Sequence, residues 1–312
     1  MEESQQNKVN GSDSLKWDGK TGGGAFGQSF LLWLLGFANV RVLYPILYLT
    51  IPFYLLFGKK GRQAIYQYFR ERHHYSPMKA AWATFRNHIL FGQVVLDKFA
   101  LLAGNRKQFK IVCESDYIPP MMNQEKGFFI VGAHVGNLEL SGLCYPIQKK
   151  RINAIISMSE RAAFQKRRDD AFGSSNINLI PVMPDMSHLF TIKEVIEKGE
   201  IVVIPSDRLF GSPKSVTCDF LDGTANFPIG TFRLAAQLDV PVVSLFIMKE
   251  HGTTYKIHEQ PIDTHSELPN STKKAEAMTH DYVNVLQEVV KKYPTQWFNF
   301  FPFWNENADK NE

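Results

Sequence analysis

Apolar and polar positions change character abruptly near the N-terminus. Residues 1–24 are polar and end in three glycines, which predicts a flexible tail. Residues 30–57 then read FLLWLLGFANVRVLYPILYLTIPFYLLF, with Arg41 as the only charge. A spanning helix needs about 20 apolar residues, but a polar Asn-Val-Arg tripeptide interrupts this stretch and two prolines follow it. We therefore expect two short apolar helices within residues 25–57, as a hairpin or in a membrane interface. A buried core hairpin is the alternative.

Residues 58–106 form the next segment and carry a helical pattern. Between positions 78 and 103, apolar side chains recur at intervals of three, four or seven residues, namely Trp82, Phe85, Ile89, Leu96 and Phe99. This spacing predicts an amphipathic helix. We interpret it as a packing helix that joins the apolar segment to the rest of the chain.

From residue 107 to residue 312, short apolar runs alternate with helical patterns. The predicted strands are 108–113, 127–132, 152–157, 178–182, 200–205 and 241–248. The predicted helices are 137–148, 160–171, 187–198, 229–238 and 271–293. Such alternation predicts an α/β domain with a largely parallel central sheet flanked by helices, in which the chemistry lies at the carboxyl ends of the strands.

The composition is that of an ordinary globular protein. A chain of 312 residues allows one large domain or two modest ones. Its 44% apolar and 21% charged residues exclude a disordered, collagen-like or coiled-coil protein. Three widely spaced cysteines favour neither a disulfide framework nor a zinc site, so we expect a reducing compartment. No clustered set of Cys and His ligands is present, and we predict neither a metal nor a redox cofactor.

The net charge of +4 hides an uneven distribution. Residues 58–110 contain 11 Lys and Arg but only two acids, a local charge of +9 that leaves −5 for the remainder. Basic residues beside an apolar segment mark the cytoplasmic side of a membrane and attract anionic lipids. We therefore expect attachment to an anionic membrane surface. Nucleic-acid binding is less favoured, because no recognition-helix or RNA-binding signature accompanies the basic residues.

The strongest chemical signal follows the predicted strand 127–132, where the chain reads Ala-His-Val-Gly-Asn-Leu-Glu. His134 stands at the end of a buried strand, Gly136 allows a tight turn, and Asn137 is a suitable N-cap for a helix. Glu139 can then meet His134 from the first turns of that helix and hold one imidazole nitrogen, while the other nitrogen accepts a proton. The pattern predicts a general-base dyad without a serine nucleophile, suited to direct acyl transfer.

Two other classes of function remain open on these residues. One is a non-catalytic lipid-binding protein, against which the intact His134 and Glu139 pair argues. The other is a hydrolase of thioesters or lipids, in which water replaces the acceptor. Ser141 is the serine nearest the pair, and it lacks the Gly-x-Ser-x-Gly setting of a serine hydrolase.

The segment around His134 resembles the His-x4-Glu box of the lysophospholipid acyltransferase superfamily, in particular its late lipid A (lauroyl/myristoyl) acyltransferase branch. Further blocks resemble that branch in the same order: 204–211 (IPSDRLFG), 220–231 (FLDGTANFPIGT) and 293–297 (YPTQW). The opening WDGKTGG at 17–23 and the closing aromatic run are similar to members from Bacteroidetes-type bacteria. The resemblance covers nearly the whole chain from about residue 16.

The resemblance implies a membrane-associated enzyme that moves a fatty acyl group from an acyl carrier protein or acyl-coenzyme A to a lipid acceptor. It implies work at the cytoplasmic face of the bacterial inner membrane. His134 would be the general base and Glu139 its orienting partner, with Asp207 and Arg208 near a substrate headgroup. A structural ion pair is the alternative for Asp207 and Arg208. The other positions expected around the substrate are Gly136, Asn137, Phe227, Pro228 and Gly230.

Two features bear on the substrates. A basic patch offers a docking face for an acidic acyl carrier protein, although solvated helix faces explain it equally well; it comprises Lys149, Lys150, Arg151, Arg161, Lys166, Arg167 and Arg168. The run 298–304 (FNFFPFW) is uncharged, where lipid A acyltransferases tend to carry His and Arg. This departure weakens lipid A as the acceptor and favours a less anionic lipid, an amino-acid lipid or a polyene pigment precursor.

Overall fold

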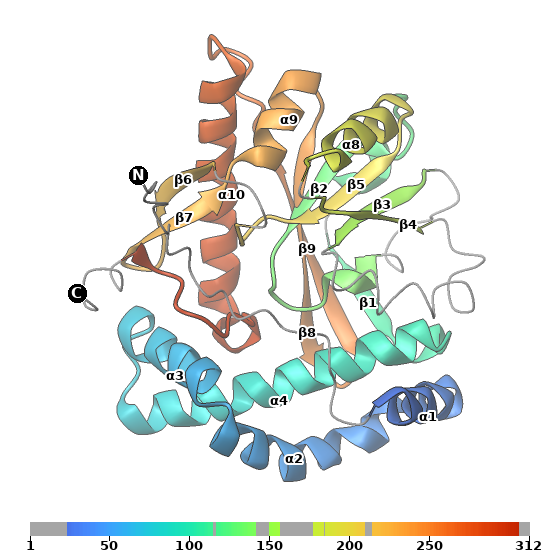
Figure 1. The fold of residues 1–312 in the computed structure, drawn as a ribbon, viewed down its shortest axis with the longest axis vertical. Helices are drawn as coiled ribbons and strands as arrows, with labels where there is room; N and C mark the ends of the chain where they lie inside the picture. The colour runs from blue at the N-terminus through green and yellow to red at the C-terminus, as the bar shows by residue number, and fades with distance from the viewer. Residues whose placement is uncertain are drawn as a thin grey trace, which may run out of the picture.

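The computed structural model describes residues 24–305 except 115–116, 142–149, 157–176, 184 and 210–213. The polar tail, the predicted helix 160–171 and most of the predicted helix 137–148 lie outside the described residues. In Figure 1 the sheet and its flanking helices stand above a layer made by the four N-terminal helices α1 to α4.

The apolar segment folds as two short helices, as its interrupting residues predict. Helix α1 spans Gly24–Phe37, and helix α2 spans Tyr44–Phe57. Between them lies a single 3₁₀ turn, η1 (Val40–Leu43), which Asn39 caps by accepting a hydrogen bond from the backbone N–H of Arg41. Among the described residues, one helical segment, Val40–Phe57, is apolar and long enough to cross a membrane by length and composition, and 11% of it is buried.

The basic segment contains the predicted amphipathic helix. Helix α3 spans Lys59–Gln67, and the long helix α4 spans Pro77–Leu102, where the Ser76 side chain caps the first turn. The predicted apolar stripe is buried in part: Ile89 is buried, and Leu96 and Phe99 pack against a buried cluster, but Trp82 is 61% exposed. The buried face of α4 also includes three polar side chains, Asn87, His88 and Asp97. For Asn87 and Asp97, partners in distant parts of the chain, described below, are the reason.

A seven-stranded sheet forms the centre of the α/β domain, in the order β1-β9-β8-β2-β5-β3-β4. Its strands are β1 (Lys110–Cys113), β2 (Phe128–Gly132), β3 (Ile152–Ile156), β4 (Ile177–Pro181), β5 (Ile201–Pro205), β8 (Val242–His251) and β9 (Thr254–Ile262). The strands from β8 to β4 in that order run parallel, whereas β9 pairs antiparallel with β8 and carries β1 parallel to itself. The predicted α/β class with a largely parallel sheet is confirmed.

Three strands escaped the sequence analysis. The hairpin of β6 (Ser215–Asp219) and β7 (Thr224–Pro228) forms a separate two-stranded sheet. Polar residues interleave both of its strands, so the apolar pattern was weak, and its turn places Leu221 and Asp222 rather than Gly223 at positive φ. Strand β9 alternates buried apolar residues with polar ones.

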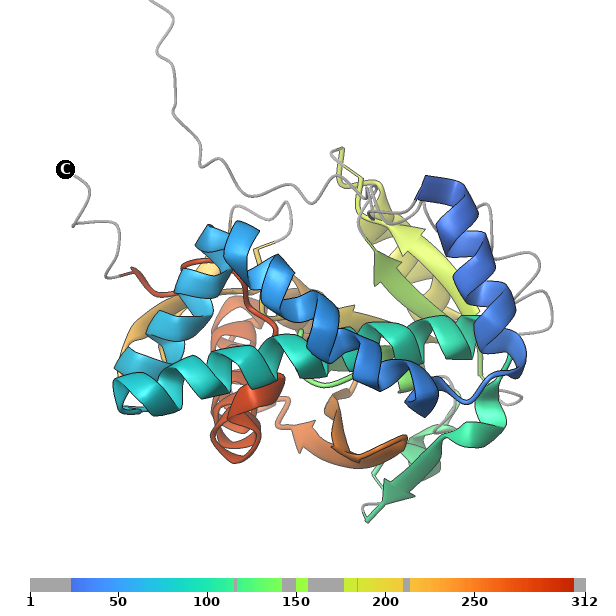
Figure 2. The same ribbon diagram turned by 90° about the horizontal axis from the view of Figure 1, so that it is seen from below.

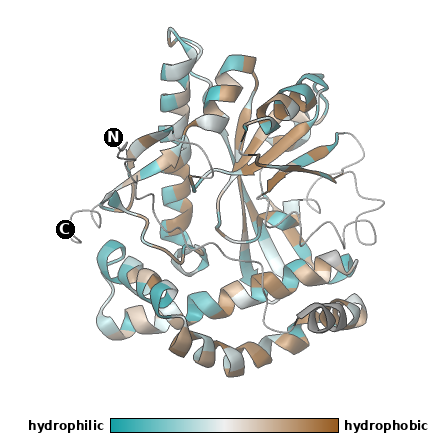
Figure 3. Ribbon diagram, in the orientation of Figure 1, coloured by the Kyte–Doolittle hydropathy of each residue, from teal (hydrophilic) through white to brown (hydrophobic). Residues whose placement is uncertain are grey.

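Helices cover the sheet and fix where its core lies. The helices after β4 are α8 (His188–Glu197), α9 (Gly230–Leu238) and α10 (Ser271–Lys292). Strand β2 is buried on both faces: Phe129 and Val131 belong to the cluster that includes residues of these helices, whereas Phe128 and Ile130 belong to a second cluster with Met122. The short helix α5 (Ile118–Met121) also contributes to the second cluster. Figure 3 shows the central strands β2 and β5 as predominantly hydrophobic. Burial on both faces makes β2 a rigid base for the residues that follow it.

Candidate active site

The ends of two neighbouring strands bring a histidine and an aspartate together. Strand β2 pairs with β5 so that Gly132 lies opposite Pro205, and the N–H of Ser206 continues the pairing to the Gly132 carbonyl at 2.8 Å. His134 and Asp207 therefore leave adjacent strands side by side. The Asp207 carboxylate lies 2.8 Å from Nδ1 of His134 through Oδ1, and accepts the backbone N–H of His134 at 3.0 Å through Oδ2.

The electrostatics of this pair determine which imidazole nitrogen can react. Asp207 is 1% exposed. Burial raises the pKa of its carboxyl, but the neighbouring His134 and the Arg208 guanidinium outweigh burial and lower that pKa to about 2. An ionised carboxylate can only accept hydrogen bonds, so Nδ1 must carry the proton. Nε2 of His134 is then the nitrogen available to accept a proton from a substrate.

Glu139 does not occupy the position expected from the sequence. It lies in the 3₁₀ turn η4 (Leu138–Leu140), and its carboxylate pairs with Lys98 of α4 at 2.5 Å, while Asp207 occupies Nδ1 of His134. The orienting contact that was assigned to Glu139 is thus made by Asp207, because the short turn carries Glu139 towards α4. Burial raises the pKa of Glu139, but Lys98 and, to a smaller extent, His134 lower it overall. Glu139 is therefore an ionised neighbour of the imidazole.

The loop after His134 is seated on strand β8. Gly136 has φ +64°, and a Cβ there would lie 2.2 Å from the Ile247 carbonyl oxygen, so only glycine fits. The next residue, Asn137, donates its backbone N–H to the same carbonyl at 2.8 Å. Asn137 precedes η4 as predicted for an N-cap, but its buried side chain makes no capping hydrogen bond.

The C-terminal segment supports the other side of this loop, residues 133–137, which is the candidate catalytic loop. The Gly136 N–H donates to the Gln296 carbonyl at 2.9 Å, and the Phe298 N–H donates to the His134 carbonyl at 2.9 Å. Asn87 of α4 holds the segment in turn, by donating to the carbonyl of Trp297 at 2.9 Å. The aromatic run therefore packs into the protein body. Phe298 and Trp304 at its two ends are buried, so packing is a second explanation for the lack of charge in this run.

The remaining predicted residues occupy different environments. Arg208 donates to the Phe298 carbonyl at 2.9 Å, and its guanidinium lies 5.3 Å from the centre of the Phe301 ring. Phe227 is fully buried in an aromatic cluster. Pro228 ends β7 and Gly230 begins α9. No hydrogen bond among the described residues joins these last three residues to His134.

Two further expectations concern partners and metals. Of the basic patch proposed for an acyl carrier protein, only Lys150 and Arg151 are described, and Lys150 is buried against the carbonyls of Lys126 and Gly199. In the described part of the chain, no group of three or more His, Cys, Asp or Glu side chains could hold a metal ion.

Lys98 is the site residue that the sequence analysis missed, because nothing in a basic helix distinguishes one lysine from another.

A histidine at the end of a buried parallel strand, held by an ionised aspartate from the next strand, defines an α/β protein equipped for general-base chemistry. The sequence profile of the family described as Bacterial lipid A biosynthesis acyltransferase matches residues 86–306. The chain therefore belongs to this family and is an acyltransferase. The family transfers acyl groups in lipid biosynthesis and is associated with membranes. No curated protein matches the chain significantly.

Proposed function

We propose that this acyltransferase moves a fatty acyl group from an acyl thioester to a hydroxyl or amine of a lipid-like acceptor, with His134 as the general base. The observation that carries the proposal is the contact of Asp207 with Nδ1 of His134 at 2.8 Å, which leaves Nε2 as the proton acceptor. Asp207 replaces Glu139 as the orienting residue in this mechanism.

The proposed reaction needs no covalent enzyme intermediate. Nε2 of His134 takes the proton of the acceptor hydroxyl or amine as its oxygen or nitrogen attacks the thioester carbonyl carbon. The tetrahedral oxyanion then collapses, the carbon–sulfur bond breaks, and the leaving thiolate takes the proton from the imidazolium. Asp207 and Glu139, both ionised, stabilise the imidazolium while it exists.

We assign the surrounding residues to substrate positioning. Arg208 can bind a phosphate or carboxylate of a substrate headgroup, and the amides that open α9 at Gly230 can stabilise the oxyanion. Phe227 and Pro228 lead the chain into that helix, while Gly136 and Asn137 hold the catalytic loop against the Ile247 carbonyl of β8. The donor in this proposal is an acyl carrier protein or acyl-coenzyme A.

We further propose that the enzyme attaches to the cytoplasmic face of the bacterial inner membrane through α1, α2 and the exposed side of α4. Large apolar side chains are exposed there: Trp33, Phe37, Val42, Ile46, Leu49, Phe53, Phe57, Met78 and Trp82. Helix α2 also packs lengthwise on α4, with Tyr48 against Phe85 and Leu47 against Gly92. Figure 2 shows these helices lying side by side. This packing favours helices lying in the interface over a spanning helix.

The test uses purified full-length protein in lipid nanodiscs with a radiolabelled acyl thioester, and follows both thiol release and the fate of the label. We expect His134→Ala to lower transfer about 10³-fold without changing membrane association. His74→Asn is the matched control, because His74 also pairs with an aspartate, at 3.1 Å from Asp222, but on the exposed surface. Asparagine tolerates the positive φ of that position.

Three results would contradict the proposal. If His134→Ala transferred acyl groups at the wild-type rate, His134 would not be the general base. Label that ends as free fatty acid in every acceptor mixture would indicate a hydrolase. Lipid binding without thiol release from any thioester would indicate a non-catalytic protein.

A further inference from the structure

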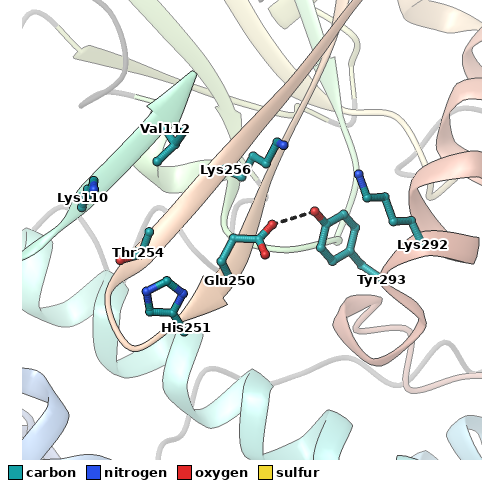
Figure 4. Close-up of a pocket in the computed structure, with 8 residues that line it drawn as sticks. All are labelled: Lys110, Val112, Glu250, His251, Thr254, Lys256, Lys292 and Tyr293. Carbon is teal, nitrogen blue, oxygen red and sulfur yellow. Dashed lines mark hydrogen bonds between the residues drawn. The ribbon is translucent and has the colours of Figure 1, made fainter. Parts of the chain in front are cut away.

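A groove on the sheet lies outside the catalytic site. It has a volume of about 490 Å³ and is formed by β1, the β8–β9 hairpin and the end of α10. Its charged and polar lining residues are Lys110, Glu250, His251, Thr254, Lys256, Lys292 and Tyr293. Three lysines thus come together from three elements that are far apart in the sequence. Figure 4 shows Lys256 and Lys292 on either side of the contact between Glu250 and Tyr293.

The charge of this groove is net positive. The three lysines face two carboxylates, which leaves a charge of +1. One carboxylate is Glu250, which accepts a hydrogen bond from the Tyr293 hydroxyl at 2.7 Å, and the other is Glu114. Lys256 also pairs with Glu114 at 2.6 Å, which leaves Lys110 and Lys292 as the two lysines that would contribute in full. The pKa of the nearby His258 is lowered, first by burial and then by the positive charges of Lys292 and Lys256. Such a groove attracts an anion.

The position of the groove points to the source of that anion. The β8–β9 turn, which adjoins the groove, is tied to the apolar helices: Arg41 donates to the Thr253 hydroxyl at 2.8 Å, and the Tyr44 hydroxyl oxygen lies 3.3 Å from the Gly252 carbonyl oxygen. Val42, beside Arg41, is 70% exposed. Figure 2 views this side and shows the strand hairpin next to α4 and near the start of α2. A membrane that receives the apolar helices therefore places its phosphate layer next to the groove.

We propose that this groove binds the phosphate of an anionic lipid headgroup and so sets the orientation of the enzyme on the membrane. The inference rests on the membrane attachment within the proposed function, and it is independent of the catalytic role of His134. An acidic carrier protein would need a broad, accessible face. The side of the groove that adjoins the apolar helices would instead be covered by the bilayer, which favours a lipid.

The experiment measures binding of the full-length protein to sedimented vesicles of pure phosphatidylcholine or of phosphatidylcholine with 30 mol% (about a third) phosphatidylglycerol. The test variant is Lys110→Gln with Lys256→Gln and Lys292→Gln. The matched control is Lys126→Gln with Lys193→Gln and Lys198→Gln. It removes the same charge from three exposed, ion-paired lysines near the other end of the strands.

A lysine beside an anionic surface contributes a factor of about five to binding. With two lysines contributing in full, the test variant should bind the anionic vesicles about 25-fold more weakly than wild type. The control should change by about twofold or less. Binding to phosphatidylcholine should be unaffected, because the apolar helices are intact. Equal losses in the two variants would overturn the proposal, since only total charge would then matter.

Other ligands give different results. Displacement of the wild type from anionic vesicles by millimolar inorganic phosphate at constant ionic strength would show a site for free anions and contradict the lipid assignment. Unchanged vesicle binding together with weakened binding of purified acyl carrier protein would make the groove a protein-docking surface. If the wild type bound none of the vesicles, the proposed membrane attachment would be refuted. The role of His134 would still be tested separately, by measuring acyl transfer in detergent.

Discussion

A buried ion pair joins the apolar helices to the catalytic body, and its removal tests how they are held together. Asp97 of α4 is fully buried and lies 2.5 Å from Nζ of Lys249 on β8, whose side chain is 2% exposed. The hydroxyls of Tyr44, which begins α2, and of Tyr255 on β9 also donate to the Asp97 carboxylate. The cluster therefore connects four elements through one carboxylate.

We predict that Lys249→Met lowers the free energy of unfolding by about 3–5 kcal/mol, the typical cost of leaving one buried charge without its partner. Burial already raises the pKa of Asp97 in spite of Lys249 and lowers the pKa of Lys249 in spite of Asp97, so neither charge is well solvated alone. In the double variant Asp97→Asn with Lys249→Met, the neutral amide needs no counter-ion. The double variant should therefore lose less stability than Lys249→Met alone.

Urea unfolding in mild detergent, followed by tryptophan fluorescence and circular dichroism, measures these differences. The pH dependence supplies a second readout. Without Lys249, the pKa of Asp97 in the folded state lies further above its unfolded value, so protonation stabilises the variant at low pH and this stability is lost as pH rises. The gap to wild type should narrow as pH falls from about 7 to about 5. A double variant that loses as much stability as Lys249→Met, or more, would refute the reasoning.

Two further predictions concern the catalytic loop. Gly136→Ala should lower the free energy of unfolding by about 3 kcal/mol or more and abolish transfer, because the new Cβ meets the Ile247 carbonyl at a positive φ. Gly104→Ala is the control: its φ is +81° but nothing lies within 4 Å of the new Cβ, so it should lower the free energy of unfolding by about 1–2 kcal/mol and leave transfer intact. The pair of Asp207 with His134 should stabilise the protein by about 2 kcal/mol above pH ~4, the ordinary pKa of aspartate, and this contribution should disappear as pH falls through about 2. Acid unfolding of Asp207→Asn against wild type measures it, and parallel pH curves would contradict the assignment.

Helix α4 shows how far a pattern of apolar residues can be taken. Its spacing predicts a helix over 78–103, and the structure has one over Pro77–Leu102. The same pattern assigns Trp82 to the packed face, yet Trp82 is exposed, while the polar Asn87 and Asp97 are buried. Those two are buried because they bind the Trp297 carbonyl and Lys249. Both partners lie more than 100 residues away along the chain, so the local sequence does not reveal them. The periodicity of apolar residues predicts that the helix exists. Which side of the helix is buried also depends on side-chain partners from distant parts of the chain.

The local sequence alone determined the strand that carries His134, the turn at Gly136 and the alternation that makes a largely parallel sheet, because each depends on residues within one strand or one turn. Only the tertiary structure decided the partner of His134. Glu139 is five residues away along the chain but is drawn to Lys98, whereas Asp207 is 73 residues away and reaches the imidazole. The reason is that β5 lies beside β2 in the sheet although the two strands are far apart along the chain, and no local pattern records such a pairing.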